Sequence, residues 1–476
     1  MSLEIDKNFL LKSTLYNFLG TALKVVAPIL TIVLARIFGK EEFGIFVGTQ
    51  LWIFTLSRVS VFGLDKGLNW FLPQNILNNR PAHLGFNESL SRSLIISSII
   101  FVAMFICAVL GLHKYSESLA TLSSAELSIY ALSIIPFSAL HIFGGTVEGL
   151  RKPQYRMFIT ECAVFALAPL LSIVFNFTDI PYALPTGLLI ANIFGCFIYI
   201  PLIKKSFPFS LKFFSNKIPR ELLVYSVPRG FSEVVVSVSM RIDVWMILLM
   251  LGPGEAGVYA VMTTISNGLR TIRQSYHPIL LPVIAGMSKD RLSTDLKPIF
   301  SYCVNMVSLI QLVIGFFIVL FPDKILMIAG KDFIVQPETL GILLLAHLLG
   351  GFFLLSASVL NGIGKSLYTL KMDIASLCVS FLVNYFLIPI LGLPGAALST
   401  LAYIILQAVW NNIYIFKLHL RLYSKKIIPY AIWSIFLLVV YILLPSFSLS
   451  FLQKIIFYIV ILSGLAFTQV LIKNSK

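Results

Sequence analysis

The chain is poor in charged residues. Only 12% of its 476 residues are Asp, Glu, Lys or Arg, whereas 58% are hydrophobic. A soluble domain carries roughly twice that charged share, so water cannot be the main solvent of this protein. The sequence also lacks any polar interval long enough to form a soluble catalytic domain. An enzyme with extramembrane chemistry is therefore not expected.

Motifs for metals, redox chemistry and nucleotides are absent as well. The five cysteines are scattered, with no Cys-x-x-Cys pair and no paired histidine beside them. Cysteines in that arrangement are typical of small apolar packing residues. The chain has no Gly-x-x-x-x-Gly-Lys-Ser/Thr phosphate loop, which argues against nucleotide hydrolysis. We expect no cofactor and no metal site.

Long apolar runs are what the sequence has in abundance. A helix needs about 20 apolar residues to cross a membrane, and such runs recur from end to end with short polar breaks. The first run begins near Phe9 without a cleavage site after it, and is read as a retained span. Fourteen helices are predicted, at residues 10–36, 43–64, 89–112, 125–148, 157–177, 181–203, 220–250, 255–284, 297–321, 338–361, 370–390, 394–417, 427–445 and 451–472.

The loop cations set the orientation. With the N-terminus inside, 24 Lys and Arg residues fall in inner loops and six in outer loops. This asymmetry follows the positive-inside rule and predicts a cytoplasmic (inner) membrane protein with both termini in the cytoplasm. It also accounts for the net charge of +15 without a nucleic-acid partner.

The sequence repeats itself at an offset of 213 residues. The repeat predicts two six-helix lobes, 1–212 and 213–420, related by a pseudo-two-fold axis along the membrane normal, followed by a helix pair at 421–476. The matched glycines suit a tight turn between helices. The aligned pairs are Gly39 with Gly252, Glu42 with Glu255, Gly44 with Gly257, Phe46 with Tyr259, Gly149 with Gly362, Lys152 with Lys365, Tyr155 with Tyr368, Pro181 with Pro394 and Ala183 with Ala396.

Six cations lie inside the predicted spans. Each would cost about 2.5–3.5 kcal/mol at a helix centre facing lipid, so they are expected to face water or one another. Because the repeat equates the helices that carry them, we predict that they converge on a cavity between the lobes and bind substrate there. They are Lys24, Arg58, Arg229, Arg241, Arg270 and Arg273.

The spacing of these cations leaves two interpretations open. Arg270, Arg273 and His277 share one helix face, which favours a common ligand. Arg229 with Glu233 and Arg241 with its neighbouring acid are equally well explained as local ion pairs.

Fewer acids than cations lie in or near the spans. The excess positive charge favours an anionic ligand, and arginine forks suit phosphate or diphosphate best. The acids and one histidine are candidates for coupling transport to H+ or Na+, although a structural hydrogen bond explains each as well. These candidates are Asp65, Glu161, Glu233, Asp243 and His277.

The motifs together resemble a known family. The likeness is to polysaccharide biosynthesis exporters, and it is found in the segments Leu34–Phe46, Tyr225–Pro228, Arg241–Asp243, Leu251–Tyr259 and Asn361–Lys365. These exporters are the Wzx-type branch of the multidrug/oligosaccharidyl-lipid/polysaccharide (MOP) exporter superfamily. The resemblance implies a V-shaped, MATE-like bundle that rocks to flip an undecaprenyl-diphosphate-linked oligosaccharide, an O-antigen or capsule unit, to the periplasmic leaflet. It also implies ion-gradient antiport and association with polysaccharide polymerase machinery.

Three alternatives remain. A peptidoglycan-precursor (lipid II) flippase shares the architecture and a cationic cavity, so charge does not exclude it. A MATE-type drug or cation antiporter is expected to have a cavity dominated by acids and aromatic groups. A membrane glycosyltransferase would need a larger extramembrane loop than this sequence offers.

Overall fold

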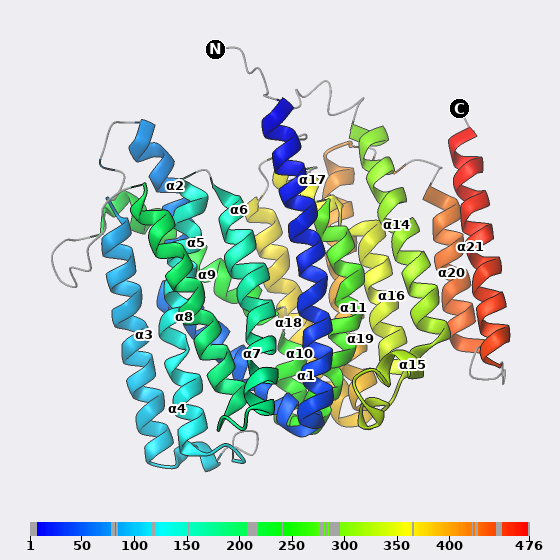
Figure 1. Cartoon of the computed structure of the whole chain (residues 1–476). Helices are drawn as coiled ribbons and strands as arrows, with labels where there is room; N and C mark the ends of the chain where they lie inside the picture. The colour runs from blue at the N-terminus through cyan, green and yellow to red at the C-terminus, as the bar shows by residue number, and fades with distance from the viewer. Residues whose placement is uncertain are drawn as a thin grey trace. The chain divides into compact units, whose positions relative to one another are not determined.

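The protein is almost entirely helical. In the residues that the structure describes, helices are the regular structure and no strand occurs (Figure 1). The predicted all-α class is therefore confirmed. This computed structural model describes residues 7–77, 81, 84–115, 120–150, 152–206, 218–239, 241–276, 280, 284, 296–363, 366–420, 422–423, 427–443 and 450–474.

The chain forms two compact units, Met1–Gly257 and Val258–Lys476. The first unit extends past residue 212 because α9 and α10 contact α1, and α9 also contacts α2. The two six-helix lobes deduced from the repeat stay a prediction. Helices of the first unit are α1 (Lys7–Val61), α2 (Leu64–Leu77), α3 (Phe86–Val109), α4 (Ser124–Leu132), α5 (Ile134–Gly149), α6 (Pro153–Arg156), α7 (Phe165–Phe177), α8 (Ala183–Lys204), α9 (Arg220–Ser239) and α10 (Ile242–Met250).

Helix α5 forms the centre of the first unit. It contacts α1, α2, α3 and α8, and most of its side chains are buried. The span formed by α4 and α5 is 72% buried in its most apolar stretch, whereas that of α3 is 17% buried. An apolar helix that is exposed nearly all round is stable only in lipid, so α3 faces the membrane.

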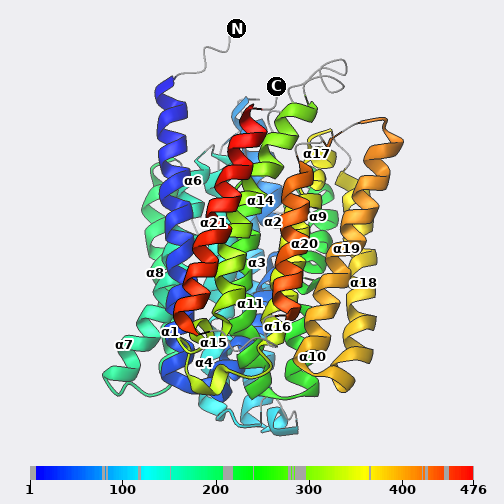
Figure 2. The same cartoon turned by 90° about the vertical axis from the view of Figure 1, so that its right-hand side faces the viewer.

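The second unit is built on a tight helix pair. The α18–α19 pair turns at Gly392, α16 packs on α19, and α14 contacts α16, α20 and α21 (Figures 1 and 2). Its helices are the rest of α11 (Pro253–Ser275), α14 (Leu296–Leu320), α15 (Pro322–Leu326), α16 (Glu338–Phe353), α17 (Ser356–Gly362), α18 (Ser366–Leu391), α19 (Leu393–Lys417), α20 (Ile428–Leu443) and α21 (Phe451–Asn474).

Each predicted span overlaps an observed helix, but the number of fourteen is not confirmed. Among the described residues, eight helices are long and apolar enough to cross a membrane, or nine with the bent pair Val26–Val61 and Leu64–Asn75. Helices α16 and α20 have only 16 residues each. The chain is nonetheless a multi-pass membrane protein, because this many lipid-length helices cannot all be buried within protein.

The repeated glycines adopt the turn conformation expected of them. Gly39 interrupts α1 with a φ of 77°, and Gly252, its counterpart, has a φ of 99° between α10 and α11. A residue with a Cβ is strained at such φ values, so glycine is required at both positions. Gly149 and Gly362, another matched pair, are each the last residue of a helix.

Candidate functional site

A break between α1 and α2 brings two opposite charges together. Phe62 and Gly63 have positive φ values of 42° and 77°, so α1 ends and α2 begins in a new direction. Arg58 in the last turn of α1 thereby reaches Asp65 in the first turn of α2, with Nη1 and Oδ2 3.2 Å apart. Asp65 is fully buried, so this ion pair is shielded from water.

Helix α9 supplies a second acid to Arg58. The Glu233 carboxylate lies 3.8 Å from Arg58 Nη1, although the two residues are far apart in the sequence. Arg229, which local spacing equally favoured as the partner of Glu233, has an exposed side chain on α9. Glu233 therefore pairs with Arg58 of α1 and not with Arg229 of its own helix.

The network continues to α5 and α6. Arg156 lies 2.8 Å from Glu148 and 3.9 Å from Asp65, and Asn69 of α2 donates to Glu148 at 2.9 Å. Arg156 is one of the 24 cations predicted to lie in inner loops, and Glu148 was not predicted to belong to a site. Both stand at predicted helix ends, where a buried charge and a loop charge look alike in sequence. Arg156 is in fact 7% exposed.

A histidine lies beside these charges. His141 of α5 is buried between the rings of Phe54 and Phe137, and Arg58 stacks over Phe54 at 5.4 Å. Neither ring nitrogen of His141 has a hydrogen-bond partner among the described residues. Arg58, Arg156 and Lys66 all act electrostatically on His141. This arrangement is not the cation-rich site expected around Arg58, because the carboxylates of Asp65, Glu148 and Glu233 balance these cations.

The second unit has a cluster in which cations outnumber acids. Arg270 and Arg273, one turn apart on α11, both act electrostatically on His347 of α16 and on Tyr403 of α19. Arg273 also approaches Gly350 of α16, with Nε 4.0 Å from where a Cβ would stand. The two guanidinium groups therefore lie together inside the second unit, as their shared helix face indicated.

One acid belongs to this second cluster. Asp373 of α18 accepts a hydrogen bond from Gln407 of α19 at 2.9 Å, and Gln407 also bonds the Tyr403 hydroxyl at 2.7 Å. Sequence reasoning missed Asp373, although an acid in an apolar run is a recognisable signal of function. Among the described residues that these contacts connect, two guanidinium groups face one carboxylate, so positive charge prevails.

The remaining expected site residues divide into two groups. Arg241 stands at the exposed N-cap of α10, and Asp243 accepts from the backbone N–H of Val244 at 2.8 Å. Glu161 lies in a π-helix, Met157–Val164, a conformation frequent at functional sites. The side chains of Glu161 and Lys24, and all of His277, lie outside the described residues.

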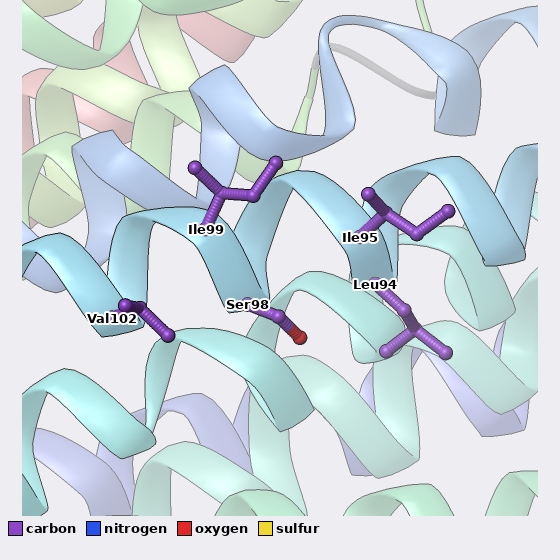
Figure 3. A pocket seen from close by; sticks show the side chains of 5 residues that line it. All are labelled: Leu94, Ile95, Ser98, Ile99 and Val102. Atoms are coloured by element: carbon purple, nitrogen blue, oxygen red, sulfur yellow. The ribbon is translucent and has the colours of Figure 1, made fainter.

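An apolar groove runs along the membrane-facing side of α3. It encloses about 360 Å³. Its lining comes from one helix, with Leu94, Ile95, Ser98, Ile99 and Val102 spread along it (Figure 3). Such a surface is what any lipid-facing helix presents, so the groove fits an acyl or prenyl chain without specifying one.

Solved structures with a similar fold include a lipid flippase and a multidrug transporter. The inward closed lipid II flippase MurJ matches with a TM-score of 0.70 and 15% identity, covering 96% of this chain and 100% of that one. An inward-facing multidrug resistance MATE transporter of the MOP superfamily matches with a TM-score of 0.64 and 16% identity, covering 84% and 95%. The chain therefore has the MOP-superfamily transporter fold.

The family is narrower than the fold. The profile of the polysaccharide biosynthesis protein family matches residues 10–288, and the chain belongs to this family. An uncharacterised membrane protein of Methanocaldococcus jannaschii is 23% identical over 418 residues, which are 84% of this chain and 95% of that protein. The Wzx-type resemblance drawn from the motifs agrees with this family.

Proposed function

We propose that this protein is a flippase for an undecaprenyl-diphosphate-linked oligosaccharide, an O-antigen or capsule repeat unit. It moves the lipid from the cytoplasmic to the periplasmic leaflet of the inner membrane, with both termini in the cytoplasm. The membership in the polysaccharide biosynthesis family and the likeness to a lipid II flippase support this assignment. The observation that carries it is the pairing of Arg270 with Arg273 in a cluster with one carboxylate.

The chemistry of a diphosphate fits that pair. Guanidinium groups bind phosphate oxygens with two parallel hydrogen bonds, and two of them one turn apart can each engage one phosphate. The excess positive charge of the cluster is neutralised when the anion binds. That Lys24, Arg58, Arg229 and Arg241 contact the same ligand stays a prediction. Of these four, Arg58 has the least charge left to offer a ligand, because it already pairs with Asp65 and Glu233.

The carboxylates around Arg58 in the first unit suit the coupling ion. Asp65 and Glu233 share Arg58, so loss or gain of a proton by either changes the balance of the whole network. Na+ would be held by the same carboxylates. Glu161, Asp243 and His277 remain further candidates, and Asp373 joins them from the structure. Transport by ion-gradient-coupled alternating access, with no cofactor and with polysaccharide polymerase as a partner, completes the proposal.

Surface-glycan export tests the role of the arginine pair. In cells that lack the native gene, the variant R270A/R273A, expressed at the normal level, is expected to lose export. The variant R270K/R273K keeps the positive charges but lacks the planar guanidinium groups that bind phosphate through two parallel hydrogen bonds. It should retain only part of the export. Arg220→Ala, at the exposed start of α9, is the matched control. Full export by R270A/R273A would refute the diphosphate role.

A lipid II flippase is the second candidate. It is favoured by the higher TM-score of MurJ, 0.70 against 0.64 for the MATE transporter. Rescue of cells depleted of their lipid II flippase, without restoration of surface glycan, would select this alternative. Increased drug resistance alone would instead select the MATE-type antiporter.

A further inference from the structure

A polar pocket lies at the end of the first unit where Gly39 interrupts α1. It encloses about 400 Å³, and its wall comes from α1, from α4 and the residues before it, and from the turn between α7 and α8. The predicted orientation puts this end at the outer face of the membrane. The pocket shares no residue with the network of Arg58 and Asp65.

Three carboxylates line the pocket. Glu41 and Glu42 come from α1 and Glu126 from α4, and Glu42 and Glu126 repel each other electrostatically. Glu126 Oε2 accepts the backbone N–H of Ser123 at 2.9 Å in a capping box. In the described part of the chain, none of the three takes part in an ion pair, and no Lys or Arg lines the pocket. The lining is therefore anionic.

A buried tyrosine points to a ligand in this pocket. Tyr130 is 1% exposed and lines the pocket, within electrostatic reach of Glu42 and Glu126. Its hydroxyl forms no hydrogen bond to another described residue. The hydroxyl is not among the side-chain atoms that are both cut off from solvent and unpartnered, so it opens into the pocket and is available to a ligand there. A bound molecule would satisfy it.

The arrangement suits an organic cation better than a metal ion. Among the described residues, no group of three or more His, Cys, Asp or Glu is placed to hold a metal. The carboxylates are instead spread around a pocket that aromatic residues also line, Phe38, Tyr130 and Tyr182 among them. Proteins usually bind an ammonium group with carboxylates and the faces of aromatic rings.

We infer that this pocket binds an organic ammonium group at the outer face of the membrane. The group comes either from the headgroup of an aminophospholipid or from an amino sugar. This site is independent of the diphosphate-binding role given to Arg270 and Arg273.

Calorimetric titration of the purified full-length protein in detergent tests the site. The probes are dioctanoyl-phosphatidylethanolamine and glucosamine, with dioctanoyl-phosphatidylglycerol and potassium chloride as controls. Saturable binding of at least one amine is expected, and the tighter of the two identifies the source. Glu42→Gln and Tyr130→Phe should weaken it, the first by about tenfold, since Gln lacks the negative charge that attracts the ammonium group.

Three further variants make the test specific. Glu126→Gln keeps the capping box, because Gln serves there as well, and Glu88→Gln makes the same change in the capping box of α3, away from the pocket. Glu255→Gln changes the repeat counterpart of Glu42. Glu126→Gln should weaken binding about tenfold and the other two should not. No saturable amine binding, equal binding of phosphatidylglycerol, or an equal loss in Glu255→Gln would overturn the inference.

Discussion

Gly44 and Gly257 lie in mutual contact, each against the backbone that carries the other. A Cβ on Gly44 would stand 1.7 Å from the carbonyl oxygen of Pro253, and one on Gly257 would stand 2.1 Å from that of Lys40. Gly44 with Gly257, and Lys40 with Pro253, are each pairs at the repeat offset of 213 residues. An exchange of equivalent contacts is the signature of a two-fold relationship, so the two motifs pack on each other as a pseudo-symmetric pair.

Adding a methyl group at this contact is expected to destabilise the protein. In Gly44→Ala and in Gly257→Ala the obstacle is backbone, which cannot rotate away, so the cost should reach or exceed about 1–3 kcal/mol. Gly268→Ala is the control, since it lies in the same helix as Gly257 with nothing within 4 Å of the added Cβ. Thermal unfolding in detergent measures all three. Equal unfolding temperatures would show that this contact does not hold the motifs together.

The buried pair of Arg58 and Asp65 should behave as a unit. Asp65→Leu leaves a guanidinium buried beside Glu233, and we expect a loss of about 3–5 kcal/mol of stability. The double variant R58M/D65L removes both charges and should be more stable than either single variant. A double-mutant cycle from thermal unfolding gives the coupling between them. Strictly additive costs would mean that the pair contributes nothing.

Neutralising Asp373 should separate substrate binding from transport. Asp373→Asn keeps the hydrogen-bond geometry to Gln407 but increases the excess positive charge near Arg270 and Arg273. Binding of undecaprenyl diphosphate to the purified protein is therefore expected to be unchanged or tighter, while flipping in vesicles becomes insensitive to the imposed ion gradient. Weaker binding would instead make Asp373 part of the substrate site. Glu338→Gln, at the start of α16, serves as the control for loss of one negative charge in the second unit.

The contact between α2 and α9 should open during the transport cycle. Trp70 stacks on Tyr225 with ring centroids 4.6 Å apart, and Gly63 packs directly on Gly230. In a protein whose five cysteines are replaced by serine, W70C/Y225C joined by a short bismaleimide should stop flipping in vesicles. The single variants treated with the same reagent are the control. Undiminished flipping by the cross-linked protein would show that the two helices move together.

The helices themselves were predictable, because their signals are local. Apolar runs, glycine and proline breaks and the loop cations place every predicted span on an observed helix. The turn at Gly39 and Gly252 and the shared face of Arg270 and Arg273 were equally predictable, since a positive φ and a spacing of three depend on near neighbours alone. The number of membrane crossings was not predictable, because the sequence of a polar or broken helix such as α9 or α11 does not show how much of the helix lies in lipid.

The sequence by itself determined that the chain is a multi-pass helical membrane protein with an internal repeat and intramembrane arginines. Only the tertiary structure decided the charge that surrounds each arginine. Arg58 meets Glu233 and Asn69 meets Glu148 across long stretches of chain, and Arg156 turns inward from a helix end. No periodicity reports such contacts, because which helices become neighbours depends on the packing of the whole unit. The same packing surrounds Arg58 with carboxylates and places Arg270 beside Arg273.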